Sequence, residues 1–179
     1  MPLNPNTLAN SLELIGSVTN EPSVINGWGN AFVDYMLESS VIGVSPLNAT
    51  VFDPCKAAMQ LAMVGISTPH AETTLTPAAS AIVAGIEAFW DVIATQVPAT
   101  WVLVPFPLSV LLTKPTGLLT EEAKTAFKSS LDVAFTANVV GQLSASASYS
   151  AIASVIQTGN LGATVQHETT PTSTIQNVL

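Results

Sequence analysis

Apolar residues recur every three or four positions along most of this chain, which is the spacing of one face of an α-helix. The pattern predicts a short first helix around residues 8–15 and a second helix over about residues 21–40. A third helix is expected to start at Asp53, which offers an N-cap side chain, with Pro54 at the first helical position. The first third of the chain is therefore expected to be helical.

The middle and later parts of the chain keep this helical spacing. Thr76 and Pro77 repeat the cap-then-proline signal and open the most apolar stripe, formed by Ile82, Val83, Ile86, Phe89, Trp90 and Ile93. Thr120 is expected to cap a further helix, with acidic residues in the first turn, where the helix dipole favours them. The small-residue run 144–154 suits either tight packing between helices or subunits, or a weakly stable and partly exposed helix. A last short helix is predicted around residues 152–156.

Two segments do not follow the helical spacing. Residues 97–119 are too rich in proline for a helix and too apolar for a solvated loop, so we expect a buried extended crossover or an interface arm. Residues 158–179 are rich in Thr, Gln, Asn and Gly, and we predict an extended or mobile C-terminal tail. The predicted fold is mostly α, with a single helical domain of five or six helices over residues 1–157 followed by this flexible tail.

Charged residues are scarce in this chain, which bears on what surrounds the helices. The chain has four lysines, no arginine and twelve acidic residues, so that 9% of its positions are charged and its net charge is −8. An ordinary soluble domain carries roughly 25% charged residues, and charge keeps protein surfaces apart. With a mean hydropathy of +0.48, the chain is expected to be covered by copies of itself, by a larger assembly or by lipid.

This composition disfavours several classes of partner. Nucleic-acid binding needs clustered Lys or Arg, and the one local group of lysines is interrupted by Glu121 and Glu122. We expect no membrane span, because the run 101–112 is too short and the stretch 78–97 has two acidic residues near its middle. The apolar character of the same two segments leaves a membrane-associated helical protein as an alternative. No secretory signal is expected at the N-terminus.

Candidate chemistry is sparse. The carboxylate pairs Asp34/Glu38 and Glu87/Asp91 each have i, i+4 spacing, which places both groups of a pair on one helix face. Carboxylates on facing helices can hold metal ions, so a carboxylate-metal helical-bundle enzyme is a second alternative, although neither histidine follows a Glu at the spacing such sites use. No nucleophile elbow, phosphate-binding glycine loop or paired-cysteine motif is present. We therefore predict no catalytic residue, no metal and no cofactor.

The single cysteine, Cys55, has two interpretations. It follows an apparent helix start, and helix N-termini can lower the pKa of a thiol and make it reactive. The interpretation we favour is a small buried side chain.

Several stretches of the chain carry a resemblance to a known class of proteins. The chain opens with Pro-Leu-Asn-Pro-Asn-Thr-Leu at residues 2–8, and continues with Gly-Trp-Gly-Asn-Ala-Phe at residues 27–32, an alanine-rich middle and Val-Pro-Phe-Pro at residues 104–107. In pattern and composition, residues 1–140 resemble small virion structural proteins of contractile-tailed phages, particularly the marine group. The resemblance implies an uncharged subunit held in an assembly. It transfers no functional residue, because such proteins have no catalytic motif to match.

The resulting hypothesis is a non-enzymatic structural subunit of a phage particle, in its head, neck, tail or baseplate. Its expected partners are other virion proteins and copies of itself, as a homo-oligomer within the assembly. Its expected location is the virion, after synthesis in the host cytoplasm. The candidate interface residues are Trp101, Val104, Phe106, Leu108, Leu111, Leu112, Ile175, Val178 and Leu179.

Overall fold

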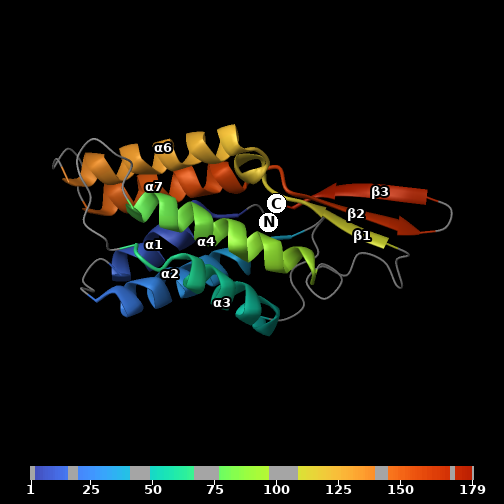
Figure 1. Ribbon diagram of the computed structural model, residues 1–179, viewed down its shortest axis with the longest axis horizontal. Helices are drawn as coiled ribbons and strands as arrows, with labels where there is room; N and C mark the ends of the chain where they lie inside the picture. The colour runs from blue at the N-terminus through green and yellow to red at the C-terminus, as the bar shows by residue number, and fades with distance from the viewer. Residues whose placement is uncertain are drawn as a thin grey trace.

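The computed structural model describes residues 3–15, 20–40, 49–66, 77–96, 109–139, 145–169 and 172–178. Within these residues the protein is mostly α-helical, as predicted, with six α-helices and one small sheet (Figure 1). The helices are α1 (Pro5–Ile15), α2 (Glu21–Met36), α3 (Asp53–Ala62), α4 (Pro77–Ala94), α6 (Glu121–Val139) and α7 (Ala145–Asn160). The 3-10 turns are η1 (Ala49–Phe52) and η2 (Thr116–Leu118), and the strands are β1 (Ser109–Thr113), β2 (Thr164–Thr169) and β3 (Thr172–Asn177).

Local signals in the sequence place the helix starts. The side chain of Asn20 caps α2, because its Oδ1 accepts a hydrogen bond from the N–H three residues later at 3.0 Å. Thr120 caps α6 in the same way at 3.1 Å, as predicted. The predicted cap at Asp53 is wrong by one position, since Asp53 is the first residue of α3 and Phe52 holds the cap position. The reason is η1, which already brings the chain into a helical turn before Asp53.

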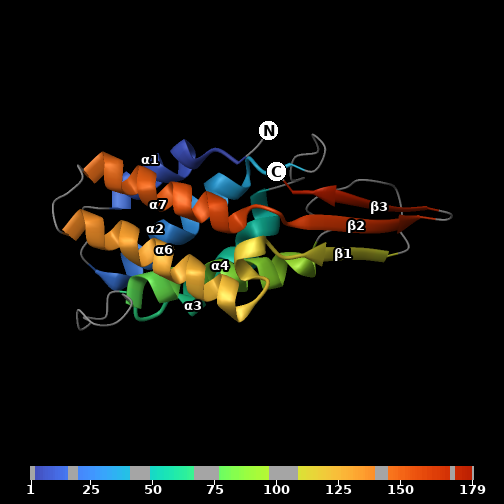
Figure 2. The same ribbon diagram turned by 90° about the horizontal axis from the view of Figure 1, so that it is seen from above.

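The helices pack in chain order around a ring. Each helix contacts the next one along the chain, from α1 through α4 to α6 and α7, and the ring closes where α7 packs against α1. Figures 1 and 2 show the result as an elongated bundle with the helices running roughly along its length. This arrangement lets each amphipathic helix bury its apolar face against its neighbours.

The core is centred on α4. All six residues of the apolar stripe predicted for this helix are fully buried. Phe89 of α4 meets the ring of Phe32 from α2 edge-on, with the ring centroids 5.0 Å apart, and also contacts Phe52. The helix predicted to be the most apolar therefore supplies the centre of the hydrophobic core.

The small-residue run forms one continuous helix with the apolar segment that follows it. Helix α7 therefore begins earlier than the short last helix expected from the sequence. Ser148 and Ala153 are buried in the bundle, while Ser150 and Ser154 are exposed and the hydroxyl of Ser154 donates to the Ser150 carbonyl at 2.8 Å. One face of the run therefore packs against the bundle and the other is exposed to solvent. Glycine disfavours a helix interior, so the sequence also favours a break at Gly141, which lies outside the described residues.

The segment predicted as a tail forms paired strands. Residues 158–179 contain the end of α7 followed by β2 and β3, which join β1 in an antiparallel sheet of order β1-β2-β3. Gly162, with a φ of 81°, turns the chain from α7 toward β2 in a backbone conformation that favours glycine. We call this sheet, residues 109–113, 164–169 and 172–177, the arm. It extends away from one end of the helical bundle (Figures 1 and 2).

Candidate functional site

The arm joins two contact segments that the sequence analysis predicted separately. β1 comes from the proline-rich segment, β3 comes from the C-terminal segment, and β2 lies between them. The register aligns Leu111 with Gln166 and Gln166 with Ile175, so these three side chains share one face of the sheet. Leu111 is 60% exposed and Ile175 is 64% exposed. We call the surface defined by these three residues the arm face.

Two other predicted interface residues point the opposite way. Leu112 is half-buried against the core and aligns with Val165, which is fully buried. Val178 is also buried, and its N–H donates to the carbonyl of Ala163 at 2.7 Å. These two residues anchor the arm to the bundle instead of forming a contact surface. The remaining candidates lie outside the described residues, namely Trp101, Val104, Phe106, Leu108 and Leu179.

Sequence reasoning missed Gln166, the central residue of the arm face. A signal for β2 and β3 does exist in the sequence, because residues 164–169 and 172–177 contain four Thr, one Val and one Ile and flank a two-residue Thr-Pro junction. The polar composition of the same stretch favoured a tail. Only the pairing with β1 shows which of its side chains lie beside Leu111.

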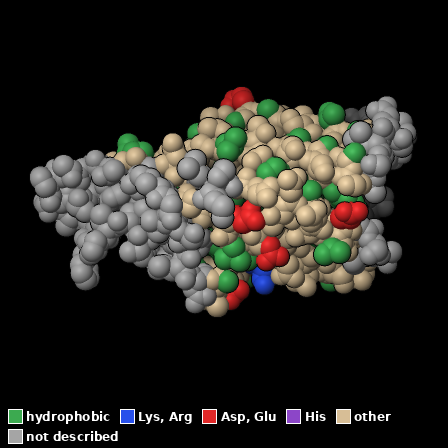
Figure 3. Space-filling view, turned by 180° about the vertical axis from the view of Figure 1, so that it is seen from behind, with side chains coloured by type: hydrophobic (Ala, Val, Ile, Leu, Met, Phe, Trp, Pro, Cys, Tyr) green, Lys and Arg blue, Asp and Glu red, His purple; other side chains and the backbone are tan. Residues whose placement is uncertain are grey.

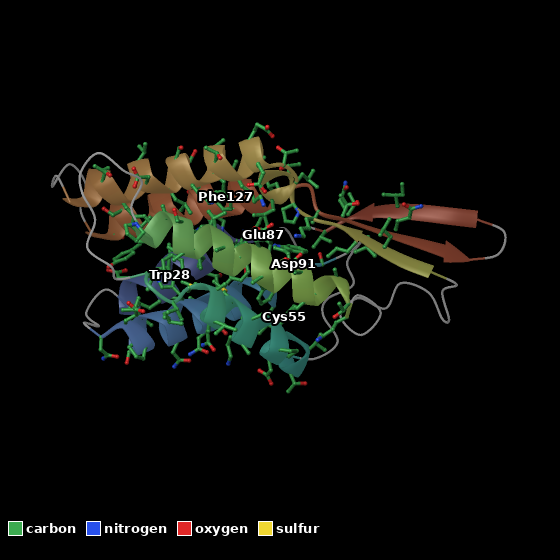
Figure 4. The ribbon with its side chains drawn as sticks, viewed as in Figure 1. Trp28, Cys55, Glu87, Asp91 and Phe127 are labelled. Atoms are coloured by element: carbon green, nitrogen blue, oxygen red, sulfur yellow. The ribbon has the colours of Figure 1, made fainter. Side chains whose placement is uncertain are left out.

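A cluster of charges lies where the arm meets the bundle. Lys114 directly follows β1, and its Nζ contacts a carboxylate oxygen of Asp91 and lies 3.6 Å from one of Glu87. The Nζ of Lys124 lies 3.1 Å from the same Glu87 oxygen and also contacts Glu121. The two carboxylates of Glu121 and Glu87 raise the pKa of Lys124 through hydrogen bonds and charge. Figure 4 shows Glu87 and Asp91 on the part of α4 nearest the arm.

Three of the four carboxylates considered as metal ligands have other partners. Glu87 and Asp91 are held by the two lysines just described. Glu38 accepts hydrogen bonds from the Thr7 hydroxyl at 2.7 Å and from the backbone N–H of Asn4 at 3.2 Å. Within the part of the chain that the structure describes, no group of three or more His, Cys, Asp or Glu residues is placed to hold a metal ion. One histidine lies outside those residues, and His167 aligns with Val110 in the sheet.

Two polar contacts fix the end of α7 beneath the arm. The N–H of Thr116 donates to the Leu161 carbonyl at 2.9 Å, which ties η2 to the turn after α7. The indole Nε1 of Trp90 donates to the Asn160 Oδ1 at 2.7 Å, and the Asn160 Nδ2 donates to the Ile156 carbonyl at 2.9 Å. The Trp90–Asn160 hydrogen bond is fully buried and joins α4 to α7. An unpaired polar group at this position would be costly.

A shallow groove of about 450 Å³ runs between α6, α7 and η2. Small and apolar residues line it, among them Phe127 (labelled in Figure 4), whose ring lies against Gly159. The hydroxyls of Ser130, Ser154 and Thr158 donate to carbonyls four residues earlier in their own helices. These hydroxyl protons are therefore already engaged in hydrogen bonds, and the groove presents mainly apolar surface.

Cys55 is fully buried in α3, and its Sγ lies 3.8 Å from the Val51 carbonyl oxygen. Burial raises the pKa of the Cys55 thiol to about 11. The small-buried-side-chain interpretation is therefore supported over the reactive thiol (Figure 4).

We expect the thiol of Cys55 to react with a disulfide reagent at pH 8 about a hundredfold more slowly in the native protein than in denaturant. Burial removes both access and the thiolate form, and unfolding restores both. The measurement is the rate of thiol release followed by absorbance, with free cysteine in the same denaturant as the control. Equal rates in the native and unfolded protein would contradict the buried, protonated state.

Among the described residues, α4 is the one helix long and apolar enough to cross a membrane, a criterion that the core helix of a soluble protein also meets. Its apolar stripe is buried inside the bundle. The space-filling view in Figure 3 shows a face on which hydrophobic and acidic side chains are scattered among backbone and other side chains, with little basic surface on the described part. Comparison with protein-family models, curated proteins and solved structures finds no match to this chain.

Proposed function

We propose that the protein is a non-enzymatic structural subunit of a phage particle that acts through protein–protein contacts made by its arm. The observation that carries the proposal is the arm face, where the solvent-exposed Leu111 and Ile175 flank Gln166 on a sheet that projects from the bundle. A projecting sheet with exposed aliphatic residues is costly for an isolated soluble protein, and such surfaces mark interaction sites.

The contacts that attach the arm to the helical bundle support the same function. Lys114 bridges to two carboxylates of α4, and Thr116 is bonded to the turn after α7. These contacts hold the arm at a defined position relative to the bundle. A subunit that must match a neighbour in a symmetric assembly benefits from such a preorganised contact element, because less entropy is lost on binding.

Two features of the described residues weigh against the alternatives. The apolar stripe of α4 packs against the other helices, so insertion of this helix into lipid would require the core to open. Glu87 and Asp91 are paired with lysines, and a metal ion at these groups would have to displace the ammonium groups. The sparse charge of the chain fits a surface that is covered in the assembled particle.

The proposal is tested by the double substitution Leu111→Asp with Ile175→Asp, which places two charges on the arm face. We expect incorporation into purified particles to fall about tenfold or more, because burying unpaired carboxylates at a contact is unfavourable. The measurement is the amount of tagged subunit per particle, by quantitative immunoblot of gradient-purified phage produced with the variant supplied in trans.

The matched control is Leu14→Asp with Leu61→Asp. These residues are 79% and 77% exposed, and they belong to α1 and α3 and not to the arm. The control should be incorporated like the unmodified chain. Absence of the unmodified protein from purified particles would overturn the proposed function, whereas equal incorporation of both double variants would remove the arm face from it. Substitution is sharper than deletion of residues 171–179, because deletion also removes β3 and the buried Val178.

A further inference from the structure

The outer edge of β3 has backbone groups that face away from the sheet. The N–H of Val178 donates inward to the Ala163 carbonyl at 2.7 Å. Because inward- and outward-facing backbone groups alternate along an antiparallel strand, the N–H and C=O groups of Asn177, Ile175 and Ser173 face outward. β3 is the last strand in the order β1-β2-β3, and within the described residues no further strand pairs with it. The arm therefore ends in a row of backbone donors and acceptors.

Among the described residues, β3 carries none of the sequence features that prevent an exposed strand from pairing. Such edges usually carry charged residues, proline or a bulge that prevents pairing with another chain. β3 reads Thr-Ser-Thr-Ile-Gln-Asn, with no charged residue, proline or glycine, and its register with β2 is continuous over six residue pairs. In Figures 1 and 2 the strand lies along the side of the projecting arm, where the helical bundle does not cover it.

The residues of β3 are also suited to pair with the β3 strand of a second copy of the chain. An antiparallel pair related by a two-fold axis at Ile175 would place Ile175 opposite Ile175 of the second copy and Ser173 opposite Asn177 of the second copy. The outward-facing residues are then the hydrogen-bonded pairs, which gives about six backbone hydrogen bonds. The exposed isoleucines make an aliphatic cross-strand contact at the two-fold axis.

Electrostatics permit this pairing at β3. Two copies with a net charge of −8 each repel one another in general. β3 is uncharged, and the closest acidic position in the sheet is Glu168 on β2, which aligns with Ser173. The arm is therefore a place where two acidic copies can meet with no charged residue on the pairing strands.

We propose that two copies of this chain pair through the outer edges of their β3 strands, in antiparallel register about a two-fold axis at Ile175, to form one continuous six-stranded sheet. The proposal rests on the proposed assembly function and names its first partner, a second copy of the same chain. Because the contact uses the same surface on both copies, it closes as a dimer and leaves Leu111, Gln166 and Ile175 of both arms on one enlarged face.

The first test is the mass of the purified full-length protein by size-exclusion chromatography with light scattering. We expect a species of twice the 18.5 kDa chain mass. Ile175→Pro should convert it to monomer, because proline removes an outward donor while an edge strand tolerates its missing N–H. Ile175→Thr is the matched control, since it keeps the backbone donor and a β-branched side chain, and it should retain the dimer. Circular dichroism and thermal unfolding establish that both variants are folded.

A cysteine cross-link tests the register of the two β3 strands independently of whether Ile175→Pro folds. Ile175→Cys should form a covalent dimer under mild oxidation, because directly opposed hydrogen-bonded residues have Cα atoms about 5.5 Å apart, within disulfide range. Asn177→Cys is the matched control on the same edge. It faces Ser173 of the second copy and not its own counterpart, so it should form little covalent dimer. The native Cys55 is buried and does not compete.

The outcomes separate this inference from the proposed function. A dimer lost in Ile175→Pro and trapped by Ile175→Cys, but not by Asn177→Cys, supports it. A monomer at high protein concentration, an oligomer insensitive to Ile175→Pro, or equal trapping of both cysteine variants overturns it. If the subunit is still found in purified particles in those cases, the proposed function stands and the arm binds a different virion protein.

Discussion

Gly117→Ala is expected to destabilise the protein by about 1–3 kcal/mol, although replacing glycine by alanine usually stabilises slightly or has little effect. A Cβ atom at residue 117 would lie 2.7 Å from the carbonyl oxygen and 2.9 Å from the Cα of Gly159. Both are backbone atoms of α7, so they cannot rotate aside as a side chain could. Relief of the clash requires η2 to move away from α7, which strains the bond from Thr116 to the Leu161 carbonyl.

The free energy of unfolding in urea is the measurement for Gly117→Ala, and Gly29→Ala is the matched control. A Cβ at residue 29 also has close neighbours, but they are side-chain atoms of Gln60 and Lys56 on α3, which can adjust. Because Gly29 lies inside α2, alanine there should be close to neutral or stabilising. Unchanged stability in Gly117→Ala would show that η2 and α7 are not in the close contact described.

Asn160→Ala is expected to lower the free energy of unfolding by about 2–3 kcal/mol, because it leaves a buried donor unpaired. Asn160 is 1% exposed and accepts from the Trp90 indole at 2.7 Å, while Trp90 itself is fully buried. Water does not reach the indole nitrogen in the folded state, so the desolvation cost of the N–H is not recovered. The substitution also removes the bond from Asn160 to the Ile156 carbonyl.

A double-mutant cycle with Trp90→Phe isolates this contact. Phenylalanine has no N–H, so Asn160→Ala should cost less in the Trp90→Phe background than in the unmodified chain. Urea unfolding gives the energies, and the loss of a shifted indole N–H resonance in the proton NMR spectrum reports the broken bond directly. Equal costs of Asn160→Ala in both backgrounds would mean that the two side chains do not interact.

Much of the helical architecture could be predicted from local pattern. The cap at Thr120, the start at Pro77 and the apolar stripe of α4 all depend on neighbours within a few residues, and the structure confirms them. The start of α3 was missed by one residue because η1 precedes it. The extent of α7 was underestimated because small residues have weak hydrophobic periodicity, and its packing against α1 and α6 is what holds them in the helix.

The arm could not be predicted from the local pattern of residues. β1 and β2 are separated by about fifty residues of chain, and short polar strands carry only a weak alternation of residue types. A shift of one residue in the register would turn Leu111 inward and Leu112 outward. Hydrogen bonds to β2 and the burial of Val165 select the observed register, and both are properties of the assembled fold.

The helices, most of their boundaries and the scarcity of charge can be predicted from the amino-acid sequence, because helical spacing, caps and composition depend on neighbouring residues. The contacts of Lys114 with Glu87 and Asp91, and the exposed face that Leu111 and Ile175 share across Gln166, depend on tertiary packing. These contacts join residues far apart in the chain. Each depends on how the ring of helices closes, and therefore on packing energies summed over the whole core.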